Sequence, residues 1–190
     1  MTARLTLLCH AATAATRAAA FPLDEPIEAR SRELAAKAAV HLPRVDRVWT
    51  SPALRARQTA EALGLAATPE PALRDCDYGR WAGRRLAELQ AAEPEAVAAW
   101  LGDPEAAPHG GESVVDLLAR VGAWLEARGG ERGHAIAITH PAIIRAAIVH
   151  VLAAPPAAFW RIDIEPLSLT ELRRGPQHWT LRATGCPLAP

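Results

Sequence analysis

The stretch AIAITHPAIIRAAIVHVL, residues 135–152, decides the fold class that we expect for this chain. Its first five residues form a short apolar run of the length of a buried strand. Pro141 suits the first position of a helix, where no backbone N–H is needed, and the apolar residues after it extend the helix to about Leu152. A strand that leads directly into a helix is the unit from which parallel α/β sheets are built.

The rest of the chain repeats this alternation of strands and helices. Further strands are predicted at residues 4–9, 45–50, 159–164, 167–173 and 179–183, with a loop at residues 10–26. The predicted helices are residues 30–42, a helix capped by Ser51 that ends near Leu63, residues 86–100 with a break at Pro94, and residues 113–128. The pattern predicts a three-layer α/β sandwich, in which a mostly parallel sheet carries helices on both faces.

The composition indicates one packed domain over residues 1–190. Half of the residues are hydrophobic, so a sizeable core is expected. The 21 basic residues balance the 21 acidic residues, so the charge does not favour nucleic acid or an anionic membrane as a partner. A small anionic ligand stays compatible with this balance, because a single pocket can be basic in a neutral protein.

The cysteines indicate the compartment. Cys9, Cys76 and Cys186 are widely spaced and form no CxxC pair, which disfavours a disulfide framework or a cysteine zinc site. This usage fits a reducing compartment. No apolar run reaches the length that spans a membrane, and the first one is too short for a signal peptide. We therefore expect a soluble, cytoplasmic protein.

Polar side chains follow three of the predicted strands. His10 follows the first strand, Ser51 and Arg55 follow the second, and His140 follows the strand at residues 135–139. Because the carboxyl ends of parallel strands share one edge of the sheet, these groups are expected to converge there. Taken singly, each has a plainer explanation as a structural histidine, a solvated arginine or a helix cap. Together they favour a site for phosphate.

Five segments resemble the phosphoglycerate-mutase-like branch of the histidine phosphatase superfamily, over roughly residues 4–155. LTLLCHAAT (5–13) is similar to the opening strand and its Arg-His-Gly motif, and TSPALRARQTAEAL (50–63) closely matches the Ser-Pro-x-x-Arg-Ala-x-x-Thr-Ala segment. The other three are DYGRWAG (77–83) followed by Glu88, GGESVVDLLARV (110–121) and AIAITHPAIIRAAI (135–148). The resemblance implies a phosphoglycerate-mutase-like fold.

The resemblance also implies a phosphatase that needs no metal and no cofactor. His10 would attack phosphorus and form a phosphohistidine. Arg55 would hold the phosphate oxygens bidentately, and His140 would donate to the same oxygens. Glu88 would protonate the leaving alkoxide and then activate water, although a glutamate on a helix is as often simply solvated. The implied partner is a small phosphorylated substrate or phosphate.

The chain departs from the family at its first motif, which is CHA at residues 9–11. The missing arginine normally holds phosphate, and losing one such contact would cost about 3 kcal/mol, on the order of a hundredfold in rate. We expect Arg17 to replace it, with the hydroxyls of Thr13 and Thr16 as further phosphate-binding groups; the alternative is a solvent-facing Arg17. Cys9 would border the phosphate as a small, inert thiol rather than act as a nucleophile.

Three functions stay open for such a pocket. A phosphatase is favoured over a mutase, because the cap segment at about residues 79–111 is short. A catalytically weakened phosphate-binding or regulatory protein is favoured by the altered first motif. A diverged enzyme that uses the same phosphate pocket is the third. The apolar tail strands would either close the sheet or make the contact of a homodimer.

Overall fold

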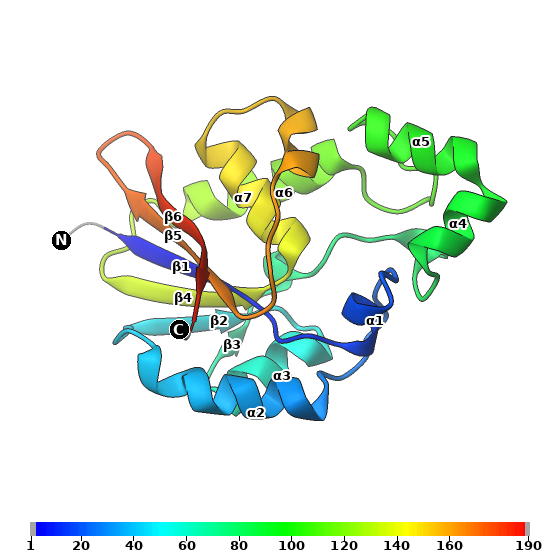
Figure 1. The fold of residues 1–190 in the computed structure, drawn as a ribbon. Coiled ribbons are helices and arrows are strands. Elements are labelled where there is room, and N and C mark those ends of the chain that lie inside the picture. The colour runs from blue at the N-terminus through cyan, green and yellow to red at the C-terminus, as the bar shows by residue number, and fades with distance from the viewer. Residues whose placement is uncertain (1–2, 189–190) are drawn as a thin grey trace.

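The computed structural model describes residues 3–188 and contains a six-stranded sheet in the order β3-β2-β4-β1-β5-β6 (Figure 1). The parallel part consists of β1 (Arg4–Cys9), β2 (Arg47–Thr50), β3 (Thr68–Pro69) and β4 (His134–Thr139). The antiparallel pairs involve β5 (Ser168–Arg174) and β6 (Trp179–Pro187). The predicted α/β fold with a mostly parallel sheet is confirmed.

Helices cover both faces of this sheet. Figure 1 shows α2 (Ala29–Ala38) and α3 (Leu54–Ala62) on one face, with α6 (Val114–Ala127) and α7 (Pro141–Val151) on the other. The side chains of β1 alternate between the two cores: Leu7 packs with residues of α6 and α7, and Leu8 packs with residues of α2 and α3. A strand that is buried on both faces explains why residues 4–9 read as an apolar run rather than an alternating one.

The loop expected at residues 10–26 contains a short helix, α1 (Ala14–Arg17). The Thr13 side chain accepts a hydrogen bond from the backbone N–H of Thr16, and the Thr16 hydroxyl accepts one from the backbone N–H of Thr13. This reciprocal capping stabilises a helix that is too short to be recognised by apolar periodicity.

The expected cap of α3 is wrong. The helix begins at Leu54 with Ala53 as its N-cap, so Ser51 lies before it. The Ser51 hydroxyl accepts a hydrogen bond from the backbone N–H of Ala53 and lies 2.7 Å from Nε2 of His140. Because these two contacts occupy the hydroxyl, Ser51 belongs to the edge of the sheet and its neighbouring histidine rather than to the helix.

The tail also differs from expectation at residues 159–164, which do not form a strand. Residues Pro156–Arg161 form a 3-10 helix, η4, with Pro156 at its start, where a fixed φ favours helical backbone. Phe159 is buried in the core shared with α6 and α7. The two prolines before Phe159 favour a helical turn in place of the predicted strand.

Two short helices, α4 (Leu86–Ala92) and α5 (Pro94–Gly102), lie away from the sheet at one end of the molecule (Figure 1). The break between them falls at Pro94, as expected. They pack on a small apolar cluster of their own, formed by Phe21, Trp81, Leu89, Val97 and Trp100. The cap segment at about residues 79–111 within a single domain stays a prediction.

Within residues 3–188, no helix is long and apolar enough to cross a membrane. The longest of these helices, α6, has 14 residues, whereas a membrane span needs about 20. In the same residues, no three His, Cys, Asp or Glu side chains are grouped so that they could hold a metal ion.

Candidate active site

A cavity of about 180 Å³ lies at the carboxyl edge of β1. Its walls come from segments that are far apart in the sequence: Cys9 ends β1 and His10 follows it, Arg55 belongs to α3, and Arg145 belongs to α7. Other lining residues include Thr13, Thr16, Glu25, Asp75 and Tyr78. The convergence expected from the strand ends therefore holds for His10 and Arg55, and it creates a hollow large enough for a phosphate.

The ring of His10 is held in one orientation. Its Nδ1 lies 2.8 Å from the carbonyl oxygen of Ala11, and because a carbonyl only accepts, Nδ1 carries the proton. Within the described residues no hydrogen bond engages Nε2. Burial lowers the pKa of His10 from 6.5 to about 3, and the nearby His140 and Arg55 add to this shift. The ring is therefore neutral at physiological pH and presents an unprotonated Nε2.

Arg55 is buried and anchored on two sides. Its Nη1 donates to the carbonyl oxygen of Leu23, and its Nη2 donates to Oδ2 of Asp75, both at 2.7 Å. Its Nε is buried and has no hydrogen-bond partner within residues 3–188. A guanidinium fixed on two sides keeps its positive charge at the wall of the cavity, where it favours an anion.

His140 stands behind the wall of the cavity rather than on it, and it is completely buried. Its ring centroid lies 5.2 Å from that of His10 in an edge-to-face arrangement. Its Nδ1 lies 3.3 Å from Oδ2 of Asp75. Burial, followed by the charges of Arg55 and Arg120, holds the pKa of His140 well below its usual value. His140 is therefore connected to the cavity through His10 and Asp75, which line it.

Asp75 is a site residue that the sequence analysis missed. Its Oδ2 accepts from Arg55 and approaches His140, while its Oδ1 accepts from the backbone N–H of Cys76 at 2.9 Å. The side chain is 14% exposed and borders the cavity. Its position two residues before the turn-rich stretch 77–83 is the signal that the sequence offers for it. Among the described carboxylates on the cavity wall, it is the one bonded to Arg55.

Glu88 lies outside the cavity, contrary to expectation. Its side chain is 59% exposed and reaches back to the start of its own helix, where it accepts a hydrogen bond from the backbone N–H of Arg85. The third position of a helix favours such a contact, because the first N–H groups have no partner in the helix. The structure therefore gives Glu88 a capping contact and gives Asp75 the place beside the phosphate cavity.

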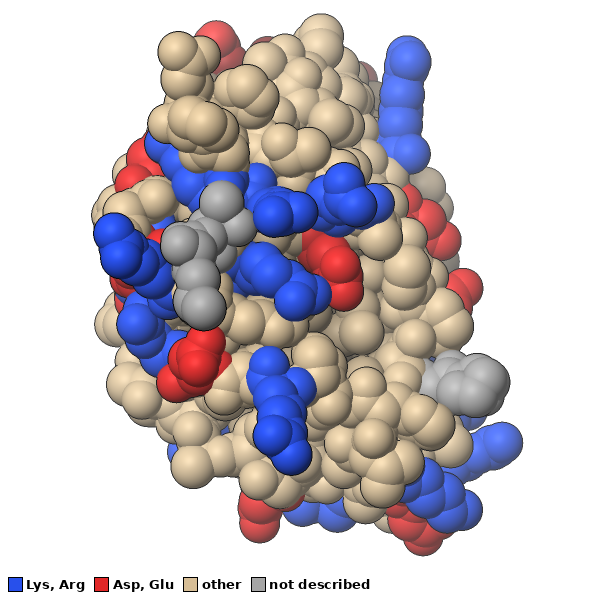
Figure 2. Space-filling view, turned by 90° about the vertical axis from the view of Figure 1, so that its left-hand side faces the viewer, with Lys and Arg blue, Asp and Glu red and all other residues tan. Residues whose placement is uncertain are grey.

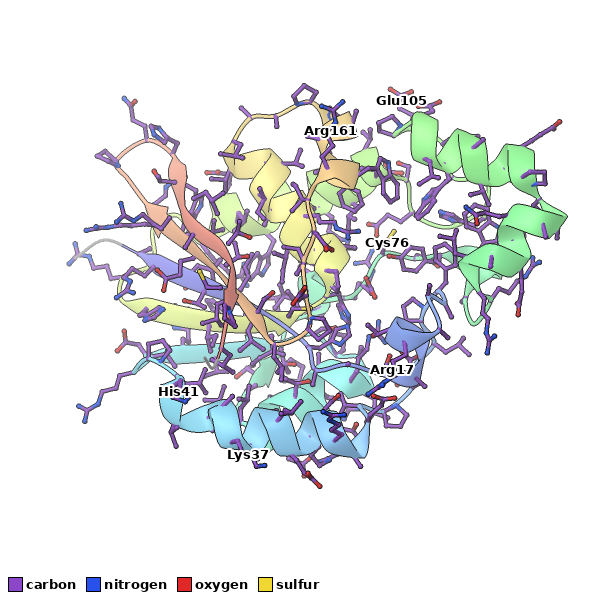
Figure 3. The ribbon with its side chains drawn as sticks, in the orientation of Figure 1. Arg17, Lys37, His41, Cys76, Glu105 and Arg161 are labelled. Carbon is purple, nitrogen blue, oxygen red and sulfur yellow. The ribbon has the colours of Figure 1, made fainter. Side chains whose placement is uncertain are left out.

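Arg17 also lies outside the cavity. Its side chain, labelled in Figure 3, is 61% exposed, and its Nε is 2.6 Å from a carboxylate oxygen of Glu28. The isolated bridge between Thr13 and Ile27 brings Glu28 beside α1. The expected replacement of the motif arginine by Arg17 is therefore wrong in placement, and the solvent-facing alternative describes it.

The remaining predicted residues do border the cavity. Thr13 and Thr16 line it, and the Thr13 hydroxyl donates to a carboxylate oxygen of Glu25 at 3.0 Å. Cys9 is fully buried, and burial raises the pKa of its thiol far above the usual value. A protonated thiol is a poor nucleophile, so Cys9 occupies the place of the motif arginine without supplying charge.

A second hollow of about 380 Å³ adjoins the first. The two share lining residues, among them Thr16, Tyr78 and Arg145. The rest of the wall of the second hollow is largely apolar: Phe21, Leu86 and Trp100 line this hollow and not the first, and Pro141 and Ile164 line both. A phosphate in the first hollow would thus have an apolar chamber beside it, which is defined here by these five residues and is named the apolar chamber below.

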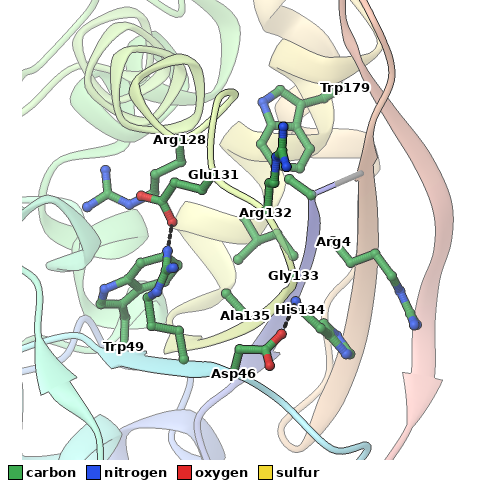
Figure 4. Close-up of a pocket in the computed structure, with 13 residues that line it drawn as sticks. Arg4, Asp46, Trp49, Arg128, Glu131, Arg132, Gly133, His134, Ala135 and Trp179 are labelled. Carbon is green, nitrogen blue, oxygen red and sulfur yellow. Dashed lines mark hydrogen bonds and ion pairs between the residues drawn. The ribbon is translucent and has the colours of Figure 1, made fainter. Parts of the chain in front are cut away.

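The cavity described at the opposite edge of the sheet is much smaller. Figure 4 shows a cavity at the amino ends of β1 and β4, but its volume is only about 20 Å³, enough for about one water. Around it, Figure 2 shows basic side chains gathered on this face, where Arg4, Arg47 and Arg132 are exposed. Arg47 pairs there with Glu131. The basic face and the phosphate-sized cavity are therefore at different ends of the strands.

The fold and the site together define a class of α/β proteins in which a neutral histidine and a buried arginine share a cavity at the carboxyl edge of a sheet. The model of the histidine phosphatase superfamily (branch 1) matches residues 5–187, and the chain belongs to that superfamily.

Several relatives carry names. The bifunctional protein Rv2228c of Mycobacterium tuberculosis is 32% identical over 129 residues, which are 65% of this chain and 35% of that protein. Glucosyl-3-phosphoglycerate phosphatase of Mycolicibacterium vanbaalenii is 38% identical over 104 residues, 52% of this chain and 46% of that protein. The native structure of mycobacterial glucosyl-3-phosphoglycerate phosphatase superposes with a TM-score of 0.82 at 25% identity and covers 100% of both chains. The sequence matches thus span about a third to a half of the curated relatives' length.

Proposed function

We propose that this chain is a metal-independent phosphatase that hydrolyses a small phosphomonoester through a phosphohistidine on His10. The observation that carries this proposal is the unprotonated Nε2 of His10 beside the buried guanidinium of Arg55 on the wall of one cavity. A neutral imidazole is a nucleophile, and a fixed guanidinium offsets the charge that develops on phosphate oxygens.

In the first step, Nε2 forms a bond to phosphorus as the bond from phosphorus to the alcohol oxygen breaks. The Asp75 carboxylate accepts the proton carried by the phosphomonoester monoanion and passes it to the departing oxygen, so that an alcohol leaves rather than an alkoxide. In the second step, water attacks the phosphohistidine while Asp75 takes a proton from it. The phosphorus–nitrogen bond breaks, Asp75 returns the proton to the departing phosphate, and both Nε2 and the Asp75 carboxylate are restored.

His140 has a positioning role in this scheme. It contacts Ser51 through Nε2 and approaches Asp75 through Nδ1, and its ring packs against His10. His140 therefore fixes the positions of the proton donor Asp75 and the nucleophile His10 relative to each other. This differs from the direct contact with phosphate that the family resemblance implies, because His140 does not line the cavity.

The relatives support the reaction, and the chamber suggests a substrate class. Relatives named as phosphatases act on the substrates in their own names, glucosyl-3-phosphoglycerate among them. In this chain the space beside the phosphate is the apolar chamber, which offers few partners for sugar hydroxyls. We therefore propose that the substrate is a phosphomonoester whose alcohol part is largely apolar. We propose that the protein acts on it in the cytoplasm. A homodimer stays a prediction.

The test is to trap the covalent intermediate. The protein is incubated with 4-nitrophenyl phosphate, quenched rapidly, and analysed for phosphate bound through a P–N bond, which is labile in acid and stable in base. We expect a phosphorylated peptide that contains His10, and loss of both label and turnover in His10→Ala. The matched control is His41→Ala, because His41 is exposed and distant from the cavity (Figure 3). Turnover that persists in His10→Ala would overturn the proposal.

A second candidate function, phosphate binding without turnover, is favoured by one observation: the uncharged, buried Cys9 borders the cavity. Such a protein would bind inorganic phosphate yet leave aryl phosphates intact from acidic to neutral pH. The same experiment separates the two functions, because only a phosphatase releases 4-nitrophenol.

A further inference from the structure

The cavity wall carries balanced charge, but the charges are not equally engaged. Two guanidinium groups, of Arg55 and Arg145, and two carboxylates, of Asp75 and Glu25, line it within the described residues. Arg55 is bonded to Asp75 at 2.7 Å. Glu25 accepts from the Thr13 hydroxyl. Among the described residues of the wall, Arg145 is therefore the cation that is not paired with either of these two carboxylates.

Arg145 is only weakly held by its own partner. The nearest ion pair joins its Nη2 to Asp163 at 3.7 Å, and the Asp163 side chain is 91% exposed. An ion pair with an exposed partner at that distance contributes little free energy to holding the side chain in place. The guanidinium also lies 5.8 Å from the centre of the Phe159 ring, which supports one of its faces. These contacts orient the group without using up its donors.

The Nε of Arg145 is buried and lacks a hydrogen-bond partner within residues 3–188. The side chain borders both the phosphate-sized cavity and the apolar chamber, so it stands where the two hollows meet. Its positive charge also opposes the upward shift in the pKa of the Cys9 thiol, as expected for a cation near that residue. Because the ion pair of the guanidinium with Asp163 is weak, its Nη groups stay available to an anion in the cavity.

We propose that Arg145 binds the phosphoryl oxygens of the substrate and thereby supplies the positive charge that Cys9 fails to supply at the first motif. This role rests on the proposed phosphatase function. Arg55 and Arg145 approach from α3 and α7, which lie on opposite faces of the sheet, so the phosphate would be held from two sides. The cation has moved from the end of β1 to the first turns of α7.

The first experiment compares Arg145→Met with Arg161→Met and Arg17→Met, in which the replaced arginines are exposed and lie outside the cavity. Phenyl phosphate is the substrate, since it has no second charged group. We expect Arg145→Met to lower kcat/KM on the order of a hundredfold, and to weaken binding of inorganic phosphate, with both controls near the wild-type values. A loss below threefold in both measurements would overturn the proposal.

The second experiment tests directly whether the positive charge of Arg145 replaces the charge that is missing at Cys9. In Arg145→Ala, added guanidinium ion should restore part of the lost activity, which a merely structural role would not allow. In Arg145→Met, the further change Cys9→Arg should recover kcat/KM at least tenfold if it folds. Absence of guanidinium rescue in a folded Arg145→Ala would also count against the role. If the wild-type protein hydrolyses nothing, the proposed function fails, and phosphate affinity alone decides the role of Arg145.

Discussion

The replacement Asp75→Asn separates the two carboxylates that compete for the role of proton donor. Asp75 borders the cavity and accepts from Arg55 at 2.7 Å, whereas Glu88 is 59% exposed and caps α4. Asparagine keeps the shape and can still accept from Arg55, but it cannot exchange a proton. General acid catalysis contributes typically about 10²–10⁴-fold, so kcat/KM for an alkyl phosphate should fall by about that factor.

The leaving group makes this prediction specific. The 4-nitrophenolate anion leaves without help from an acid, so Asp75→Asn should lower kcat/KM for 4-nitrophenyl phosphate much less than for a simple alkyl phosphate. kcat/KM is the right measure, because it reports the steps up to formation of the phosphohistidine and not the later attack of water. Glu88→Gln, the matched control, should leave kcat/KM for both substrates unchanged.

The same variant also probes stability. Removing one partner of a buried ion pair outright costs about 3–5 kcal/mol, but the asparagine amide retains a hydrogen bond to Arg55, so the free energy of unfolding should fall by less than that. An equal loss of kcat/KM for both substrates, or a loss in Glu88→Gln comparable to that in Asp75→Asn, would refute the assignment of the proton donor to Asp75.

Three further predictions concern acid stability, backbone conformation and specificity. The pKa of His10 is about 3 in the folded protein and about 6.5 in the unfolded chain, so the unfolded state binds more protons below pH 6.5. The free energy of unfolding should therefore fall by up to about 1.4 kcal/mol per pH unit towards pH 3. His10→Gln should flatten this slope in acid denaturation curves. Gly79 has φ +47°, and a Cβ there would lie 2.2 Å from a carbonyl oxygen, so Gly79→Ala should destabilise by at least about 1–3 kcal/mol in urea unfolding, whereas Gly102→Ala, in open space, should not. Leu86 lines the apolar chamber and Leu152 does not, so Leu86→Asn should lower kcat/KM for 1-naphthyl phosphate about tenfold and Leu152→Asn should not; equal effects would remove the chamber from substrate binding.

Local pattern was sufficient wherever a residue's neighbours along the chain also determine its environment. The apolar runs of β1 and β4 are continuous because both strands are buried on two faces, and the spacing within α6 follows the face it buries. Strand ends follow from strand positions, so the meeting of His10 and Arg55 at one edge of the sheet could be predicted from the sequence. The family resemblance rests on these same segments.

Only the tertiary structure decided which charged side chains enter the cavity. Arg17 is closer to His10 along the chain than Arg145 is, yet the bridge between Thr13 and Ile27 sets Glu28 beside Arg17 and draws it outward. Arg145 reaches the cavity because α7 packs against the sheet with that face turned to the site. A long charged side chain can pair with any of several groups within its reach, and these groups come from distant segments of the chain. The direction of the side chain therefore depends on how the helices pack and not on the local sequence.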